Sequence, residues 1–272
     1  MLNKNFNLHL TDLCNYRCKY CFVKKEKKFL SLDECKHIVD NISNYFVTNN
    51  ISDGKINIAG GEPTTCRYLQ DIIDYIVEKD IKVTLITNGS MLTESFIEKN
   101  RNKLYMIGLS VDSIKTSTNV LIGRCTYGKG KVLDYNQLRK ICLCIKANGI
   151  LLKINAVVSK LNLNEDILQL LEDVCPNRLK FLQMLPFDDF SKCISVSNAE
   201  FAEYLKKYQK FNYVPEYSAD IAGSYMIIDS SGFVSTNNLH IDRQCSALQS
   251  PIGEIIKHIE FNYEGENKRY QI

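Results

Sequence analysis

Two periodicities alternate along most of this chain. Apolar runs of strand length are each followed by a segment in which apolar residues recur at helical spacing. Six such units fit into residues 1–211, and strict alternation is typical of a parallel sheet covered by helices. Since six units are too few for a closed eight-unit barrel, we expect an α/β fold with a partial barrel or an open sheet. The strands are expected at 4–11, 55–59, 81–86, 104–110, 150–158 and 178–184, and the helices at 31–47, 66–79, 93–100, 134–147, 164–174 and 197–211.

Residues 212–272 depart from this alternation. The stretch SYMIIDSSGFVS, residues 224–235, has the pattern of a β-hairpin, and a short helix and a polar tail are expected after it. No linker rich in Pro, Gly or Ser and no block of charge separates this part from the rest. Residues 1–211 and the C-terminal extension 212–272 are therefore expected to form one domain.

The eleven cysteines narrow the choice of compartment. No signal peptide precedes the first expected strand, and no apolar run approaches the roughly 20 residues that a membrane span needs. We expect a cytoplasmic protein with reduced thiols and no membrane attachment, in which clustered cysteines favour a metal over disulfides. The net charge of +3 is too small to indicate nucleic-acid binding. The sequence does not encode a readable oligomeric state, and a monomer is the expectation.

Three of the cysteines, Cys14, Cys18 and Cys21, lie in the stretch CNYRCKYC directly after the first expected strand. A structural zinc site needs a fourth ligand, and no second Cys or Cys/His pair with suitable spacing follows. A redox dithiol at Cys18 and Cys21 is a weak alternative. Three thiolates in one tight loop can instead hold a 4Fe–4S cluster and leave its fourth iron open, which indicates a catalytic centre. The other eight cysteines are scattered and are expected to be ordinary thiols.

The spacing C-x3-C-x2-C, with an aromatic residue before the last cysteine, resembles the radical S-adenosylmethionine (SAM) superfamily. GGEP, TNGS and SVDS follow at the ends of the next three strands, where parallel sheets bind ligands. The resemblance implies a partial (βα)6 barrel whose cluster binds SAM. The two glycines are expected to let the backbone approach this ligand closely, and the glutamate to accept from its ammonium group. The residues assigned to SAM are Tyr20, Gly60, Gly61, Glu62, Asn88 and Ser110.

Four of the expected strands carry polar or cationic residues on one face, although parallel strands covered on both sides should be apolar. One explanation is that these residues lie at exposed strand starts, with long side chains reaching solvent. Because an unpaired buried lysine costs several kcal/mol, several such strands together favour a cation-lined lumen around a polyanion. A nucleoside triphosphate, with about four negative charges, fits such a lumen. The residues are Asn7, His9 and Thr11; Lys55 and Asn57; Lys153 and Asn155; Arg178 and Lys180; with Arg124 as a further cation in the loop NVLIGR.

Further segments narrow the resemblance to one family. FNLHLTDLCNYRCKYC, KINIAGGEPT, NVLIGR, LKINAVV, NRLKFLQ and VPE…SYMIID occur in the order found in viperin and its prokaryotic relatives, from about residue 5 to 230. The chain therefore resembles a viperin-like enzyme. The membrane-binding N-terminal helix of the animal proteins has no counterpart. Ala59 stands where those proteins have a serine, and Cys125 and Tyr127 in the loop after NVLIG are a second departure.

The viperin family resemblance implies a 3′-deoxy-3′,4′-didehydronucleotide synthase. In that reaction the reduced cluster cleaves SAM, the resulting radical takes the ribose C4′ hydrogen of a nucleoside triphosphate, and the 3′-hydroxyl leaves as water. CTP is the expected substrate, and UTP or GTP is the alternative. The resemblance also implies an electron donor such as flavodoxin or ferredoxin, a role in antiviral defence, and a C-terminal extension that closes the site. The residues assigned to the nucleotide are Asn7, Lys55, Asn57, Arg124, Lys153, Asn155, Arg178 and Lys180.

Two other functions compete with this one. A different radical SAM enzyme, acting on a peptide or a nucleobase, would share the cysteine motif but would not need cation-lined strands. A metal-binding interaction or RNA-binding module without catalysis would instead show basic surface patches with exposed aromatics. The lysines of this chain lie inside the expected strands, which favours the nucleotide enzyme.

Overall fold

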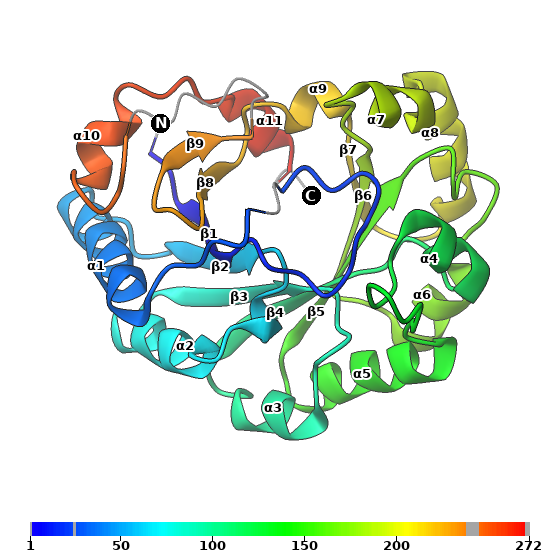
Figure 1. The fold of residues 1–272 in the computed structure, drawn as a ribbon, viewed down its shortest axis with the longest axis horizontal. Helices are drawn as coiled ribbons and strands as arrows, with labels where there is room; N and C mark the ends of the chain where they lie inside the picture. Colours follow the sequence, from blue (N-terminus) through cyan, green and yellow to red (C-terminus); the bar gives the residue numbers. More distant parts are fainter. Residues whose placement is uncertain (1, 24–25, 238–244, 270–272) are drawn as a thin grey trace.

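The fold is organised around one sheet, which the computed structural model describes over residues 2–23, 26–237 and 245–269 (Figure 1). Its strands are β1 (Asn5–Thr11), β2 (Lys55–Gly60), β3 (Lys82–Thr87), β4 (Leu104–Ser110), β5 (Leu151–Val158), β6 (Arg178–Gln183), β7 (Tyr213–Glu216), β8 (Met226–Ile228) and β9 (Val234–Thr236). Within the described residues their order is β7-β6-β5-β4-β3-β2-β1-β8-β9, and every neighbouring pair is parallel except β8 with β9. The predicted α/β fold with a mostly parallel sheet is confirmed.

Helices cover the outer side of the curved sheet (Figure 1). The described helices are α1 (Leu32–Thr48), α2 (Leu69–Glu78), α3 (Glu94–Lys99), α4 (Thr116–Ile122), α5 (Tyr135–Ala147), α6 (Leu168–Val174), α7 (Asp189–Ile194), α8 (Asn198–Leu205), α9 (Ser218–Ile221), α10 (Ile252–Ile256) and α11 (Tyr263–Lys268). Of these, α9 and α11 do not lie on the outer side. Helix α1 begins at a capping box, in which Ser31 Oγ accepts from the Glu34 amide and the Glu34 carboxylate accepts from the Ser31 amide.

The alternation of side chains along each strand separates the core from the lumen. On β5, Leu152, Ile154, Ala156 and Val158 are fully buried against the outer helices, while the residues between them are only half-buried. Strands β1 and β2 show the same division, with apolar residues on the helix side. Because this parity is fixed by the pleat of the strand, the polar residues of each strand face the inner side of the sheet.

Several elements differ from the prediction. Helices α4 and α7 and strand β7 were not expected, the helix predicted at 164–174 begins only at Leu168, and the one predicted at 197–211 ends at Leu205. Strand β7 is short and contains Pro215, which cannot donate to a ladder and is tolerated because this strand lies at the sheet edge. The hairpin predicted at 224–235 is confirmed as the antiparallel pair β8–β9.

Residues 213–236 extend the sheet at both of its edges. Strand β7 pairs with β6, and β8 pairs in parallel with β1 at the opposite edge. Helices α9 and α11 lie in the space between these two edges (Figure 1). Parts of the predicted C-terminal extension, residues 238–244 and 270–272, lie outside the described residues.

Candidate active site

The three cysteines of CNYRCKYC lie in the loop after β1, at the carboxyl end of the sheet, and all three are half-buried. The amide of Cys21 donates to the carbonyl of Cys18 at 3.1 Å, and the amide of Tyr16 donates to Cys14 Sγ at 3.3 Å. Burial raises the pKa of the Cys18 thiol to about 12, and the charges of Cys21 and Cys14 contribute to this rise. Cys18 therefore lies near enough to Cys14 and to Cys21 for their charges to act on it.

This donor set fits a 4Fe–4S cluster. It offers three thiols from one loop, as a cluster with one open iron requires, and a backbone amide already points at one of the sulfurs. Within the described residues no group of three or more His, Cys, Asp or Glu side chains is gathered closely enough to hold a metal ion, and this includes the three cysteines as they stand. Because bound iron replaces the thiol protons, it would reverse the rise in the pKa of Cys18.

The glycines of GGEP lie against the backbone of the cysteine loop. A Cβ atom on Gly60 would lie 2.3 Å from the carbonyl oxygen of Thr11, and one on Gly61 would lie 2.0 Å from that of Leu13. Gly60 also has a φ of +125°, which L side chains rarely adopt. The amides of Gly61 and Glu62 donate to Thr11 and Leu13 at 2.7 Å. The two glycines thus let the cysteine loop pack closely against the end of β2, and their approach to SAM stays a prediction.

Glu62 is buried, with 1% of its surface exposed, and its carboxylate already has several donors. Oε1 accepts from Thr64 and from Thr87 Oγ1, and Oε2 accepts from the Asn88 amide at 2.7 Å. The Asn88 side chain in turn donates to Asn15 Oδ1 in the cysteine loop at 2.9 Å. Two residues predicted to bind SAM are therefore also links between the ends of β2 and β3 and the cysteine loop.

Arg124 does not lie with the other predicted cations. Its guanidinium pairs with Asp112 Oδ2 at 3.0 Å and donates to the carbonyl of Ser110 at 2.6 Å. The hydroxyl of Tyr20 donates to the same carboxylate, and the amide of Val157 donates to its other oxygen at 2.8 Å. Asp112, which the sequence did not single out, thus joins Arg124 to Tyr20 beside the cysteine loop. Arg124 therefore does not line the same cavity as the strand cations, and its contact with the triphosphate stays a prediction.

A small recess lies on this side of the barrel. It has a volume of only about 20 Å³, and its lining includes Tyr16, Asn88, Ser110, Asn119 and Arg124. Ser110 also lines the much larger cavity described next, so it lies between the two. The SAM candidates thus surround the cysteine loop on the side of β2, β3 and β4.

The large cavity lies inside the barrel and has a volume of about 310 Å³. It takes its lining from the inner faces of β1, β2, β5 and β6 and from the C-terminal part of the chain. The parallel register brings pairs of these residues side by side in the lining of the cavity. Asn7 is paired with Asn57, Lys153 with Arg178, and Asn155 with Lys180. The predicted nucleotide residues that line it are Asn7, Lys55, Asn57, Lys153, Asn155, Arg178 and Lys180, which leaves out only Arg124.

The cations of this cavity repel one another. Burial lowers the pKa of Lys153 well below its usual value, and the charges of Lys180 and Arg178 lower it further. Burial, with Arg178 and Lys82, likewise lowers the pKa of Lys55 to about 8. The ammonium group of Lys153 has no hydrogen bond or ion pair with any of the described residues. Since like charges in a partly dry site are unfavourable, an anion in this cavity would relieve the repulsion.

Three residues of this site were missed from the sequence: Glu216, Tyr225 and Arg269. Glu216 on β7 accepts from Lys180 and pairs with Arg269 Nε at 2.8 Å, and the Tyr225 hydroxyl donates to it at 2.5 Å. The guanidinium of Arg269 also stacks on the Tyr225 ring at 3.6 Å, and its carbonyl accepts from Arg178 at 2.8 Å. Burial opposes ionisation of Glu216, but the charges of Lys180 and Arg269 lower its pKa. This buried carboxylate therefore neutralises part of the positive charge.

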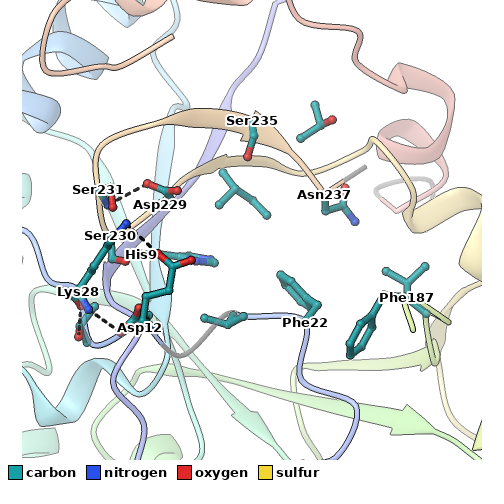
Figure 2. A pocket seen from close by; sticks show the side chains of 16 residues that line it. His9, Asp12, Phe22, Lys28, Phe187, Asp229, Ser230, Ser231, Ser235 and Asn237 are labelled. Atoms are coloured by element: carbon teal, nitrogen blue, oxygen red, sulfur yellow. Dashed lines mark hydrogen bonds and ion pairs between the residues drawn. The ribbon is translucent and has the colours of Figure 1, made fainter. Parts of the chain in front are cut away.

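A second cavity, of about 240 Å³, adjoins the first at the carboxyl end of β1 (Figure 2). His9, Phe22, Phe187 and Asn237 line both cavities. Figure 2 shows Ser235 on the side of the β8–β9 hairpin and the two phenylalanine rings on the opposite side. The inner space of the barrel thus continues from the cations on β5 and β6 to the hairpin.

The sequence profile of the radical SAM superfamily matches residues 8–174, which include the cysteine loop and strands β1 to β5. The S-adenosylmethionine-dependent nucleotide dehydratase of Flammeovirga pacifica is 32% identical over 95% of this chain and 91% of its own length. The relative of the same name from Psychrobacter lutiphocae is 31% identical over 97% of this chain and 94% of its own length. This chain is a radical SAM enzyme of the viperin-like family. A third relative of that name, from Lacinutrix mariniflava, is 34% identical over 83% of this chain but about half (49%) of its own length.

Solved structures of other radical SAM enzymes share the fold of this viperin-like enzyme. Native anSMEcpe with bound AdoMet superposes with a TM-score of 0.69 over 97% of this chain and 82% of its own, at 16% identity. Streptococcus suis SuiB bound to S-adenosylmethionine gives a TM-score of 0.71 over 93% of this chain and 65% of its own, also at 16% identity. The family binds a 4Fe–4S cluster and SAM, and the cysteine loop offers the matching donors. None of the described helices has the length and apolar character to cross a bilayer.

Proposed function

We propose that this viperin-like enzyme dehydrates a nucleoside triphosphate, with CTP as the expected substrate, to its 3′-deoxy-3′,4′-didehydro analogue. The observation that carries the proposal is the cationic face of the large cavity, to which three strands contribute cations. Lys55, Lys153, Arg178 and Lys180 line one space, and Arg269 adds a fifth cation from the C-terminal part. Several cationic side chains that line one cavity suit the concentrated negative charge of a triphosphate better than the surface of a peptide. The nucleotide dehydratase names of the relatives support the same substrate class.

We propose the following roles for the residues of this chain. Lys55, Lys153 and Arg178 bind the phosphates, and Lys180, held by Glu216 and Tyr225, orients them. Asn155, whose buried Oδ1 has no hydrogen-bond partner within the described residues, is available to a ribose hydroxyl. Asn7 and Asn57 donate into a chain that ends at the carbonyl of Met226, which fixes their amide groups beside the cavity.

The cysteine loop and the cation-lined cavity must meet at the ribose. Cys14, Cys18 and Cys21 would hold the cluster, which together with SAM supplies a radical able to remove an unactivated ribose hydrogen. Ser110 lines both the recess near Arg124 and the large cavity, so SAM bound beside Glu62 and Arg124 would reach the ribose there. Arg124, with its partner Asp112, then serves the SAM side and not the triphosphate. The positioning of the two substrates is the contribution of the protein.

Further parts of the proposal rest on the resemblance to the family. The C-terminal extension would close the site within the same domain, as the contacts of Arg269 with Arg178 and Glu216 support. We also propose a cytoplasmic monomer that receives its electron from a small redox protein and acts in antiviral defence.

The proposal is tested by anaerobic incubation of the reconstituted enzyme with SAM, dithionite and each of the four nucleoside triphosphates. Mass spectrometry should find one nucleotide, expected to be CTP, that loses one water as 5′-deoxyadenosine forms. A UTP or GTP product would keep the activity and change the base. Release of 5′-deoxyadenosine that ignores every nucleotide would refute the proposed substrate class.

A further inference from the structure

A second loop runs beside the cysteine loop and pairs with its backbone. It comprises residues 122–127, from the end of helix α4 onward, and we call it the 122–127 segment. The amides of Arg17 and Lys19 donate to carbonyls of this segment at 3.1 and 2.9 Å. An isolated antiparallel bridge joins Tyr16 to Thr126. The backbone between the three cysteines therefore finds hydrogen-bond partners in a segment that is distant in sequence.

Gly123 lies directly against the cysteine loop. It ends α4 with a φ of +86°, and a Cβ atom on it would lie 2.1 Å from the carbonyl oxygen of Arg17 and 3.3 Å from the Cα atom of Cys18. Since real Cβ atoms essentially never come as close as 2.1 Å to a backbone atom, any side chain here would displace the loop backbone at Cys18. Gly60 and Gly61 approach residues that precede the first cysteine, so Gly123 is the glycine that packs between the cysteines.

Buried side chains hold Cys18 as well. Ile122 and Tyr20 belong to a small apolar cluster with Met184 and Ile194, and Cys18 packs against this cluster. Ile122 is fully buried, and close packing of this kind resists a shift of the end of α4. Cys18 is therefore fixed to the end of α4 both through its backbone and through its side chain.

We propose that Gly123 is a positioning residue for the iron–sulfur cluster, and that the 122–127 segment fixes the backbone of the cysteine loop before the cluster binds. As they stand, the three cysteines are not gathered closely enough to hold a metal, so their thiols must come together on binding. With the backbone already held, the side chains of the cysteines remain to be ordered, which costs less conformational entropy than ordering the loop as well. The inference depends on the cluster chemistry of the superfamily and not on the nucleotide proposed above.

The comparison of Gly123→Ala with Gly149→Ala tests this role. Gly149 follows the last residues of α5 with a φ of +74°, and a Cβ atom on it would meet nothing within 4 Å. Both variants therefore strain the backbone in the same way, but only Gly123→Ala meets the cysteine loop. After reconstitution, the iron content and the cluster absorbance of Gly123→Ala should fall about tenfold, because changing a group that supports a metal ligand weakens metal binding by that order. Gly149→Ala should keep both, and the denaturation midpoints of the two metal-free variants should be similar.

Hydrogen exchange of the unchanged, metal-free chain provides a second test, which does not depend on how the variants fold. The amides of Arg17 and Lys19 should exchange more slowly than in the unfolded chain, because each has a carbonyl partner in the 122–127 segment. Exchange as fast as in the unfolded chain would mean that the cluster, and not the segment, shapes the loop.

Two further results would overturn this inference. Equal iron content in Gly123→Ala and Gly149→Ala would show that the contact with the cysteine loop does not matter for the cluster. A loss of iron in Gly123→Ala together with a much larger fall in its denaturation midpoint would make Gly123 a residue of overall stability. Because none of these measurements uses a nucleotide, the inference and the nucleotide proposal can fail separately.

Discussion

The cysteine-loop region and the cation-lined cavity lie in the same barrel but satisfy their polar groups in opposite ways. Around the cysteine loop, Glu62, Asn88, Asp112 and Arg124 are hydrogen-bonded to one another or to the backbone. In the cavity, Lys153 has no ion-pair partner among the described residues, and its pKa is lowered by burial and by neighbouring cations. In the first region the folded chain itself supplies the partners of these four polar side chains. In the cavity the repulsion between the cations remains, and an anionic ligand can remove it.

Because of this difference, mutations in the two regions should have different effects. The polar groups of GGEP and TNGS hold the cysteine loop in place through short-range contacts, so their mutation should act first on the loop and its cluster. The cavity cations should act on nucleotide affinity and hardly on the loop. The four predictions that follow test this separation in order of decreasing effect.

The largest effect is expected from Cys18→Ser. Loss of one of three thiolates should abolish the cluster absorbance and 5′-deoxyadenosine formation, because the loop holds no fourth cysteine that could replace it. Cys193→Ser, at an exposed cysteine of α7, is the matched control and should retain both. Normal cluster content in Cys18→Ser would show that the loop does not hold the cluster as proposed.

Glu216→Gln should have the next largest effect. It leaves Lys180 and Arg269 without their buried counter-charge, and removal of one partner of such a group costs about 3 kcal/mol of unfolding free energy. Chemical denaturation measures this loss. An unchanged stability would mean that Lys180 and Arg269 are not charged together in the folded protein.

Nucleotide affinity should depend on pH through Lys55. Its pKa is about 8 because of burial and the charges of Arg178 and Lys82, and a bound triphosphate would raise it. Below pH 8 the Lys55 ammonium is already present, so this residue should cause no change in nucleotide affinity there. Above pH 8 a proton must be taken up on binding, so the affinity should fall by up to about tenfold per pH unit. Calorimetry from pH 7.5 upward in the unchanged enzyme and in Lys55→Met measures the slope, and an equal slope in both would contradict this origin.

Arg124→Lys should have the smallest effect on nucleotide affinity, within about twofold, because this residue lies outside the cavity and the change keeps its charge. The same substitution should weaken SAM binding, since lysine cannot contact both Asp112 and the Ser110 carbonyl as arginine does. A large loss of nucleotide affinity without a change for SAM would restore the original grouping of Arg124 with the strand cations.

Much of the fold and the cavity lining could be predicted because the pleat of a strand is a local rule. Lys153 and Asn155 share a face whatever surrounds them, and the parallel register then places Lys153 beside Arg178. Helix α4, with the sequence TSTNVLI, was missed because β-branched and polar residues give it little helical preference, and tertiary contacts decide.

The remaining part of the site depends on contacts between distant segments. Arg269 lies in a polar tail with no sequence pattern, and only the fold brings it to Glu216 on β7. A charged residue in the stretch YVPE was the one available signal for Glu216, whose register partner on β6 is Leu182 and whose side chain accepts from Lys180. The close contact of Gly61 with Leu13 is likewise invisible in the sequence, because a glycine near a ligand and a glycine against a backbone look the same.

Lys153→Met distinguishes a nucleotide-binding lysine from a structural one, because a binding role predicts opposite effects on nucleotide affinity and on stability. Nucleotide affinity should fall roughly ten- to hundredfold, the effect of losing about 1.5–3 kcal/mol from a charged hydrogen bond. The unfolding free energy should rise by about 1 kcal/mol, because an apolar side chain of similar length removes the repulsion with Lys180 and Arg178. Lower stability with unchanged nucleotide affinity would contradict a role of Lys153 in nucleotide binding and would make it a structural residue.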